Sequence, residues 1–388
     1  MMKIFFLIFV FLCDHLQDGS ALLSIPDSNN ALDLQVYEEA IKGHNNNVVY
    51  SPYSLQTILA EMAVGARGDT ANQIKKALKL NFEDQVIRDA FRDLTKNLSN
   101  INHIKVNSAS RAYLADGLEI EPNFIKIAEE DFNSGIENID FNKGKEAARK
   151  INSWVEKETH GKIKELMGED QLNTFTRFVL VNTLYFRGQW FHSFDEDDTE
   201  KKDFHKSLTE KIQVDMMKMS GNFELMKLPG LEVTLLKLPF ANRKAELIIL
   251  LPDKIDGLPE AEKNSEQIWM HYNYTRTYVK VYLPKFRIES NIDMVPILKN
   301  MGITNLFAKA DLSGITKEDV HVSAVRQKTF IDVNESGVEA ASATSAVGEG
   351  RSLHFSKQVA EIFKADHPFI FCILYDNNAL ITGRLTNL

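Results

Sequence analysis

Residues 335–352 form a long segment with little side-chain bulk and a single basic residue, Arg351. From Val338 onward every second position is small or uncharged, whereas Glu339 and Glu349 fall on the alternate set. A two-residue period is that of a β-strand, so one face of the segment can be buried while the other faces solvent. Glycine and alanine, however, are poor strand formers. The composition therefore predicts a segment that can join a β-sheet but need not stay in it.

Strand-like runs on both sides of this segment indicate a loop within one domain rather than a tail. Residues 330–333 alternate like a strand that leads into the segment, and residues 369–375 are apolar on both faces, as in a buried strand. A turn at 376–378 precedes another strand at 380–385. A flexible Ala/Ser/Gly linker is the alternative for the segment itself. The strands around it favour an excursion from a folded core.

The first 21 residues have the pattern of a secretory signal peptide. Lys3 is followed by ten uncharged residues, and small residues at 19–21 suit cleavage. This apolar run is too short to span a bilayer, and no later run is long enough. A buried first helix is the alternative, which the early charge and the Asp14-His15 interruption disfavour. We therefore expect a secreted, extracellular chain of residues 22–388 with no membrane anchor.

Residues 22–388 are expected to form one large domain, because they contain no Pro/Gly/Ser linker and no repeat. Cys13 leaves with the signal peptide, so Cys372 cannot form a disulfide within the mature chain. We expect a buried, inert thiol, with pairing between chains as the alternative. The net charge of −9 argues against general affinity for nucleic acids.

The motifs of common enzyme classes are absent from the sequence. There is no Gly-x-Ser-x-Gly, no His-Glu-x-x-His and no phosphate-binding loop pattern. The ten histidines are scattered without the spacing of metal ligands. We therefore expect neither an enzyme nor a bound metal or cofactor.

Apolar spacing and turn signals divide much of the remaining chain into helices and strands, a mixture typical of an α+β fold. Helices are expected at 31–41, 54–64 and 86–98, and strands at 178–186, 247–251 and 279–283.

A series of short motifs, in their order along the chain, resembles the serpin family. The motifs lie at 47–54 (NVVYSPYS), 65–70 (GARGDT), 152–155 (NSWV), 159–163 (THGKI), 182–190 (NTLYFRGQW), 283–286 (LPKF), 301–302 (MG) and 363–369 (FKADHPF). Each motif alone is weak, but their shared order across nearly the whole mature chain is specific. The resemblance implies three β-sheets, eight to nine helices, and an exposed reactive-centre loop at about 335–365.

Serpins are suicide substrates of serine proteases, so the resemblance implies inhibition by insertion of the cleaved loop into the central sheet. The family's spacing places the reactive bond at Arg351–Ser352. The hinge that precedes it is implied at Glu335, Gly337, Val338, Glu339, Ala340, Ala341 and Ser342. Lys357 offers a second basic bond, but it lies too far along the chain to keep the length of strand that inserts.

The loop has the composition of an active inhibitor. Residues 338–351 would span about 45 Å as a strand. A charge on the inward face would cost several kcal/mol if buried unpaired. The six inward residues carry no charge and include no proline: Val338, Ala340, Ser342, Thr344, Ala346 and Gly348. A non-inhibitory serpin that acts as a carrier or chaperone is the alternative.

Arg351 predicts the class of target. A guanidinium group needs a carboxylate at the base of the protease pocket, as in trypsin-like enzymes. The sequence Glu-Gly-Arg at 349–351 resembles sites cleaved by factor Xa and plasminogen activators, and glycine before arginine also suits thrombin. The candidate partners are therefore trypsin, thrombin, factor Xa and plasminogen activators. The protein is expected to be a monomer, and an anticoagulant role is one implication.

The resemblance also implies a polar cluster that controls opening of the sheet. Its residues are Ser51, Ser54, Asn182 and Gln327, with Trp190 at the top of the sheet. Gln327 stands where the family most often has histidine, and glutamine cannot titrate. Buried amides and hydroxyls need partners, so their bonds can differ between a closed and an opened sheet.

Two further sets of surface residues are candidates for ligands or glycans. Arg88, Arg92 and Lys96 lie four apart on an expected helix and form a basic stripe for a heparin-like glycosaminoglycan. Neighbouring acidic residues favour an ordinary solvated face instead. N-glycosylation sequons begin at Asn97, Asn273 and Asn334. The third lies at the start of the loop, and we expect it to be used least.

Overall fold

The computed structural model describes residues 24–80, 82–99, 101–271, 273–338 and 360–388. These residues contain nine α-helices: α2 (Ile25–Ala40), α3 (Pro52–Gly65), α4 (Gly68–Ala77), α5 (Asp84–Ser99), α6 (Pro122–Phe132), α7 (Gly144–Glu158), α8 (Leu258–Lys263), α9 (Ser265–Trp269) and α10 (Met294–Asn300). The expected signal peptide and most of the expected reactive-centre loop lie outside the described residues.

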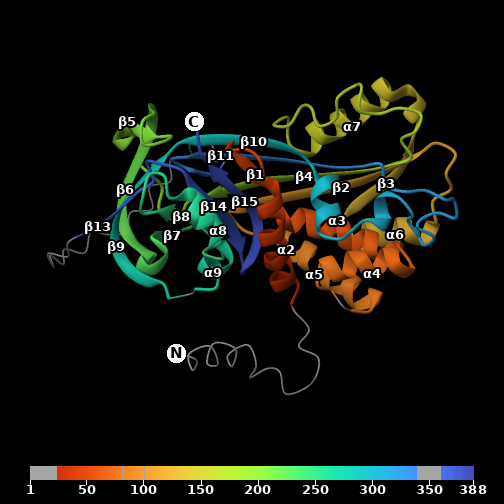
Figure 1. The fold of residues 1–388 in the computed structure, drawn as a ribbon, viewed down its shortest axis with the longest axis horizontal. Helices are drawn as coiled ribbons and strands as arrows, with labels where there is room; N and C mark the ends of the chain where they lie inside the picture. Colours follow the sequence, from red (N-terminus) through yellow and green to blue (C-terminus); the bar gives the residue numbers. More distant parts are fainter. Residues whose placement is uncertain (1–23, 81, 100, 272, 339–359) are drawn as a thin grey trace, which may run out of the picture.

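The central sheet has the strand order β10 (Phe286–Asp293), β11 (Ala324–Asn334), β12 (Gly337–Val338), β4 (Phe178–Gln189), β2 (Ile104–Ala115) and β3 (Ser134–Ile139). It thus consists of five longer strands and the two-residue β12. Helices α3, α4 and α5 lie on one side of this sheet and α7 lies on the other (Figure 1).

The remaining strands form one hydrogen-bonded assembly. Its order is β1 (Val48–Tyr50), β15 (Asn378–Leu385), β14 (Phe369–Tyr375), β8 (Ala245–Pro252), β7 (Val233–Pro239), β6 (Lys211–Leu228), β9 (Thr275–Pro284) and β13 (Glu361–Lys364), with β5 (Glu200–His205) on β6. Two of the three expected sheets are joined here, because the long β6 pairs with β5 and β9 and then, at its end, with β7.

Helix starts follow local capping chemistry. Ser51 caps α3 by accepting a hydrogen bond from the Ser54 amide, and Pro52 occupies the first turn. Ser24 caps α2 in the same way, so this helix begins six residues before the expected start at 31. Every residue of α3 is buried, which places this helix in the core between the other helices and the central sheet.

The expected strands are confirmed, with longer bounds for several. The run at 369–375 is β14, and the turn after it has left-handed backbone at Asp376 (φ 44°) and Asn377 (φ 63°), as a tight hairpin requires. Cys372 on β14 is buried, and this burial raises the pKa of its thiol well above the ordinary value. An inert thiol is therefore the reading that the structure supports.

Within the described ranges, no helix is long and apolar enough to cross a membrane. Nor does this part of the chain bring three or more His, Cys, Asp or Glu side chains together in a way that could hold a metal ion.

Candidate functional site: a seam in the central sheet

Strands β4 and β11 pair directly along only part of their length. Their parallel register has seven pairs, from Val179 with Ala324 to Tyr185 with Phe330. Beyond this last pair the two strands separate and β12 lies between them. We call the boundary between β4 and β11 the seam. Its upper end is where β12 lies, and its lower end is where β4 and β11 begin.

The two residues of β12 already occupy the upper end of the seam. Val338 is opposite Val333 on β11 and Gly188 on β4, and both pairings are antiparallel. Its side chain is fully buried in the hydrophobic cluster beneath the sheet. The start of the expected hinge therefore lies within the sheet, and Val338 faces the core as the period-two pattern predicts.

Gly337 cannot be replaced without moving the backbone. Its φ is +151°, and a Cβ atom at this position would lie 2.0 Å from the carbonyl oxygen of Gly188. Side-chain-bearing residues rarely adopt this backbone conformation, and the obstructing atom belongs to the main chain of β4. Glycine thus permits β12 to approach β4 closely enough to pair with it.

Trp190 fixes the turn between β11 and β12. Its indole Nε1 donates a 2.9 Å hydrogen bond to the Asn334 carbonyl oxygen, and its backbone amide donates to the Ser336 carbonyl oxygen at 3.1 Å. The indole stacks on Phe240 with ring centroids 4.8 Å apart. Trp190 therefore lies at the upper end of the seam, as expected.

Glu335 anchors the same turn through its buried side chain. One carboxylate oxygen lies 2.9 Å from Lys285 Nζ, and the other accepts a 2.9 Å hydrogen bond from the Thr199 hydroxyl. Burial opposes ionisation of this carboxyl group, but the hydrogen bond from Lys285, together with backbone and Thr199 hydrogen bonds, outweighs it and lowers the pKa of Glu335. Glu335 is thus held as a carboxylate at neutral pH.

The four other residues expected in the sheet-opening cluster do lie together, beneath the seam. Gln327 of β11 binds the Ser51 backbone twice, at 2.9 Å for both the amide and the carbonyl. It also donates to Asn182 of β4 at 2.7 Å. The Ser54 hydroxyl donates to the same Asn182 oxygen. A single set of side-chain bonds therefore ties both strands of the seam to the start of α3.

Three polar residues of the site were not expected from the sequence. Ser110 on β2 accepts a 2.8 Å hydrogen bond from Asn182 and extends the cluster to a third strand. Lys285 and Thr199 hold Glu335 from segments far away in the chain. Lys285 belongs to the LPKF motif that carries the serpin resemblance. Its pairing with Glu335, however, depends on tertiary structure and could not be predicted from the sequence.

The turn after α7 crosses the seam at the last β4–β11 pair. The His160 imidazole packs edge-on against Tyr185 of β4, with centroids 5.1 Å apart, and Lys162 Nζ lies 5.9 Å from the Phe330 ring centroid on β11. The turn is tied to β2, where Asn107 donates to the Glu158 carbonyl oxygen at 2.6 Å. Both strands of the seam are therefore covered by one short segment.

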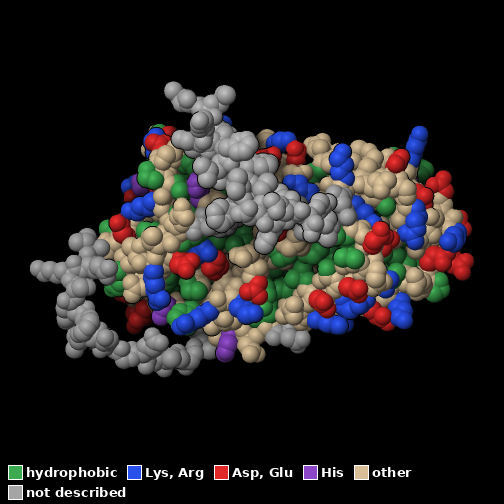
Figure 2. Space-filling view, turned by 90° about the horizontal axis from the view of Figure 1, so that it is seen from below, with side chains coloured by type: hydrophobic (Ala, Val, Ile, Leu, Met, Phe, Trp, Pro, Cys, Tyr) green, Lys and Arg blue, Asp and Glu red, His purple; other side chains and the backbone are tan. Residues whose placement is uncertain are grey.

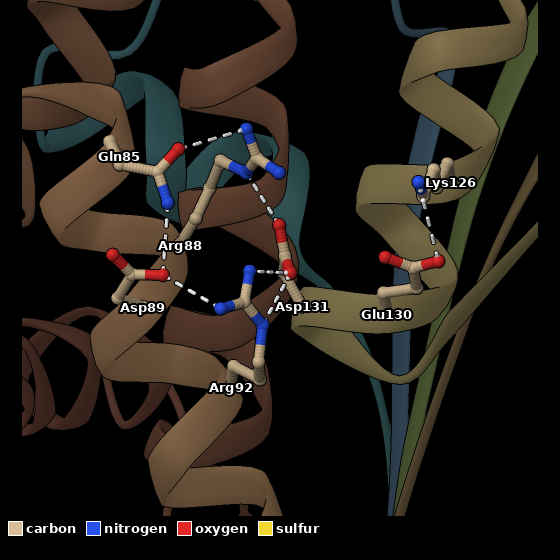
Figure 3. A network of polar contacts seen from close by, with 7 residues as sticks. All are labelled: Gln85, Arg88, Asp89, Arg92, Lys126, Glu130 and Asp131. Atoms are coloured by element: carbon tan, nitrogen blue, oxygen red, sulfur yellow. Dashed lines mark hydrogen bonds and ion pairs between the residues drawn. The ribbon is translucent and has the colours of Figure 1, made fainter.

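Two residues of the expected basic stripe on α5, Arg88 and Arg92, are engaged with acidic partners (Figure 3). Arg88 and Arg92 both bind the carboxylate of Asp131 on α6, whose side chain is fully buried. Arg92 also pairs with Asp89 at 2.7 Å. These ion pairs join α5 to α6. The negative charge of the carboxylates also offsets the attraction of the two guanidinium groups for an external sulfate. Asp131 could not be predicted as the partner, because it lies about forty residues away in the chain.

The three sequons differ in accessibility. Asn97 on α5 and Asn273 before β9 are exposed. Asn334 is half-buried, and its side-chain oxygen accepts a 3.0 Å hydrogen bond from the Ser336 amide.

Acidic and basic side chains are interspersed on the face that carries α2, α4 and α5 (Figure 2).

Several residues of the expected loop fall outside the described residues. They are Glu339, Ala340, Ala341, Ser342, Arg351, Ser352 and Lys357.

Comparison with known proteins identifies the family. The family model described as Serpin (serine protease inhibitor) matches residues 27–388. Antichymotrypsin-2 of Bombyx mori is 33% identical over 366 residues, which cover 92% of this chain and 97% of that protein. Antitrypsin of the same organism is 32% identical, with 94% of each chain covered. The crystal structure of Serpin48 from Tenebrio molitor is 37% identical with a TM-score of 0.88, and the match covers 94% of this chain and 98% of that one.

In this central sheet the two-residue strand β12 lies between β4 and β11. The family whose model matches is a class of serine protease inhibitors. The chain belongs to the serpin family. The expected α+β serpin fold is thereby confirmed, and serine proteases are the partners that this family implies.

Proposed function

We propose that this chain is a secreted suicide-substrate inhibitor of trypsin-like serine proteases, with Arg351–Ser352 as the reactive bond. The observation that carries the proposal is the position of β12, which lies between β4 and β11 with Val338 fully buried. Because the hinge has already begun to insert, the rest of the loop has a defined path down the seam.

The proposed reaction begins as ordinary proteolysis. The protease serine Oγ attacks the Arg351 carbonyl carbon, and an ester forms as the peptide bond to Ser352 breaks. The Ser352 amine leaves with a proton from the protease histidine. Water would normally hydrolyse this ester. Insertion of residues 339–351 intervenes, because the strand is no longer held at its far end.

Insertion replaces the single boundary between β4 and β11 with two boundaries, one on each side of the inserted strand. The seven direct pairs between β4 and β11 would be lost, and the inserted strand would pair with both neighbours instead. At about 1 kcal/mol of net stability per hydrogen bond, the gain is on the order of 10 kcal/mol. The Gln327–Asn182 bond crosses the seam and must break or rearrange, which makes the polar cluster a part of the barrier.

The choice of target follows from Arg351. Relatives of nearly equal identity carry the names antichymotrypsin-2 and antitrypsin, so similarity alone does not select a protease. An arginine side chain in the primary pocket selects enzymes with an acidic pocket base. The proposed target proteases are trypsin, thrombin, factor Xa and plasminogen activators. An anticoagulant role would follow if the target is thrombin or factor Xa.

The proposed setting is extracellular, with the protein acting as a monomer. The signal-peptide pattern of residues 1–21 supports secretion. Asn97 and Asn273 are exposed and are proposed as glycan sites. Asn334 is proposed as the least used, because its side chain supports the turn before β12.

The test is incubation with trypsin followed by denaturing gel electrophoresis. The parent protein is expected to form a denaturant-resistant one-to-one complex, and Arg351→Ala is expected to form none. Lys357→Ala is the matched control, since it removes the lysine of the loop nearest to Arg351 and should leave the complex intact. Undiminished complex formation by Arg351→Ala would refute the assigned bond.

The same gel separates the alternative, a non-inhibitory carrier or chaperone. Such a protein would be cut at Arg351 without retaining the protease.

Heparin binding is a weaker proposal, because Asp131 and Asp89 already pair with Arg88 and Arg92. Salt-sensitive retention on heparin that is lost in the Arg88→Ala, Arg92→Ala, Lys96→Ala triple variant would support it.

A further inference from the structure

Phe175 is the most exposed large apolar side chain that the structure describes, at 87%. It lies in the turn between α7 and β4, and this turn is well braced. The Phe175 amide donates to the Asn173 side-chain oxygen at 2.9 Å, and the Asn173 amide donates to the Thr176 hydroxyl at 3.1 Å. The backbone thus presents the ring outward in an ordered turn.

This turn lies at the lower end of the seam. The Arg177 amide donates to the Ser323 hydroxyl at 3.0 Å, and the Ser323 amide donates to the Phe178 carbonyl oxygen at 2.7 Å. These bonds connect the segments that lead into β4 and β11. β12 lies at the other end of the same seam.

The register of β12 predicts what would arrive beside this turn. Val338 is opposite Gly188, and the pairing with β4 is antiparallel. Each further inserted residue therefore moves one position back along β4. Arg351 lies thirteen residues beyond Val338, and Phe175 lies thirteen residues before Gly188. On the β11 side the same count from Val333 reaches Val320, which is consistent with the direct β4–β11 register.

We propose that Phe175 is a contact surface for the trapped trypsin-like protease after its translocation. This inference rests on the proposed inhibitory function. Arg351 would carry the protease through its ester bond, so the body of the protease must lie against the surface next to Phe175. A phenyl ring that is almost fully exposed beforehand would then be covered, and covering apolar surface is favourable.

The contact has a defined consequence for the trapped complex. Hydrolysis of the ester requires an intact oxyanion hole and a correctly placed histidine in the protease. A protease held against Phe175 has less freedom to restore that geometry. Loss of the ring should therefore speed release of active protease without changing the earlier steps, which occur at the loop and at the upper end of the seam.

The experiment measures the lifetime of the purified complex with trypsin, from the return of trypsin activity. Phe175→Ser is expected to shorten this lifetime about tenfold, the size of effect that loss of a buried aromatic contact produces. Its melting temperature, association rate and stoichiometry of inhibition should match those of the parent. Phe175→Trp should restore a long lifetime, because it keeps an apolar ring at the position.

Leu208→Ser provides the matched control. Leu208 is 68% exposed in the β5–β6 hairpin, and β5 lies at the end of the molecule opposite to β3 and α6 (Figure 1). This variant should keep the parent lifetime. An unchanged lifetime in Phe175→Ser, or an equal loss in Leu208→Ser, would overturn the role of Phe175. Failure of the parent to form any complex would instead overturn the inhibitory function, and this role with it.

Discussion

Tyr185 on β4 and Phe330 on β11 are opposite each other at the last direct pair of the seam, just below the point where β12 lies between the strands. His160 covers the first ring and Lys162 the second, both from the turn after α7. Continued insertion must part these two aromatic residues. The turn after α7 therefore bridges the first point at which the sheet has to open further.

Lys162→Ala should weaken this bridge. Loss of the cation–π contact is expected to destabilise the intact protein by about 0.5–1 kcal/mol and to speed insertion of the cleaved loop. The melting temperature of the intact form measures the first effect. Lys280→Ala is the control, because its ammonium group lies 5.3 Å from the Tyr282 ring centroid on another sheet. Equal rates of insertion in both variants would contradict a role for the seam contact.

Gly337→Ala should displace β12 from the seam. The added methyl group would meet the Gly188 carbonyl oxygen, which cannot move without breaking the pairing of β4. We expect slower insertion, so that more inhibitor is cut and released for each protease trapped. The measured quantity is the stoichiometry of inhibition of trypsin. Gly230→Ala is the control, since a Cβ atom at Gly230 would meet nothing within 4 Å. A Gly337→Ala stoichiometry equal to that of the parent would be inconsistent with this account.

Glu335→Gln should remove an acid-sensitive contribution to stability. The pKa of Glu335 is lowered in the folded protein, so its stabilising effect is present above the ordinary glutamate pKa of 4.5 and is lost as the pH falls through the folded value. The parent should therefore lose more stability than the variant between pH 6 and pH 3. Glu260→Gln, at an exposed pair with Lys263, should behave like the parent.

Glu61 gives a pH dependence of the opposite sign. Both carboxyl oxygens are buried without a hydrogen-bond partner among the described residues, and burial outweighs a favourable interaction with Ser134 and raises the pKa of Glu61 to about 8. The folded state therefore binds more protons than the unfolded state between pH 4.5 and about 8, so stability falls as the pH rises through this window.

Glu61→Gln should abolish this loss. The variant is expected to match the parent near pH 4.5 and to exceed it increasingly up to pH 8, by about 1.4 kcal/mol for each pH unit at most. Urea unfolding at pH 5 and pH 8 measures the difference. A stability difference that does not change between these two values would show that Glu61 does not titrate in this range.

The sequence predicted those parts of the fold that depend on local chemistry. An apolar run without alternation located β14, an apolar stretch located β4, and Ser51-Pro52 marked the start of α3. The resemblance to serpins then implied that Gln327 and Asn182 lie together, and the hydrogen bond between them shows that they do.

Features that depend on distant pairs could not be predicted in the same way. Nothing in the composition of 335–338 shows that β12 is already within the sheet, because this depends on how far β4 and β11 separate. The pairing of Arg88 and Arg92 with Asp131 is likewise a tertiary contact. The four-residue spacing places the basic residues on one face of α5, but it could not show that Arg88 and Arg92 share a buried carboxylate on α6.

We propose that the seam between β4 and β11 accepts the cleaved loop as a strand. The most direct measurement is the melting temperature of the protein before and after a single cut at the Arg351–Ser352 bond. We expect the melting temperature to rise by about 10–20 °C, from a gain on the order of 10 kcal/mol in a chain of this size. An unchanged melting temperature after a complete cut would contradict it.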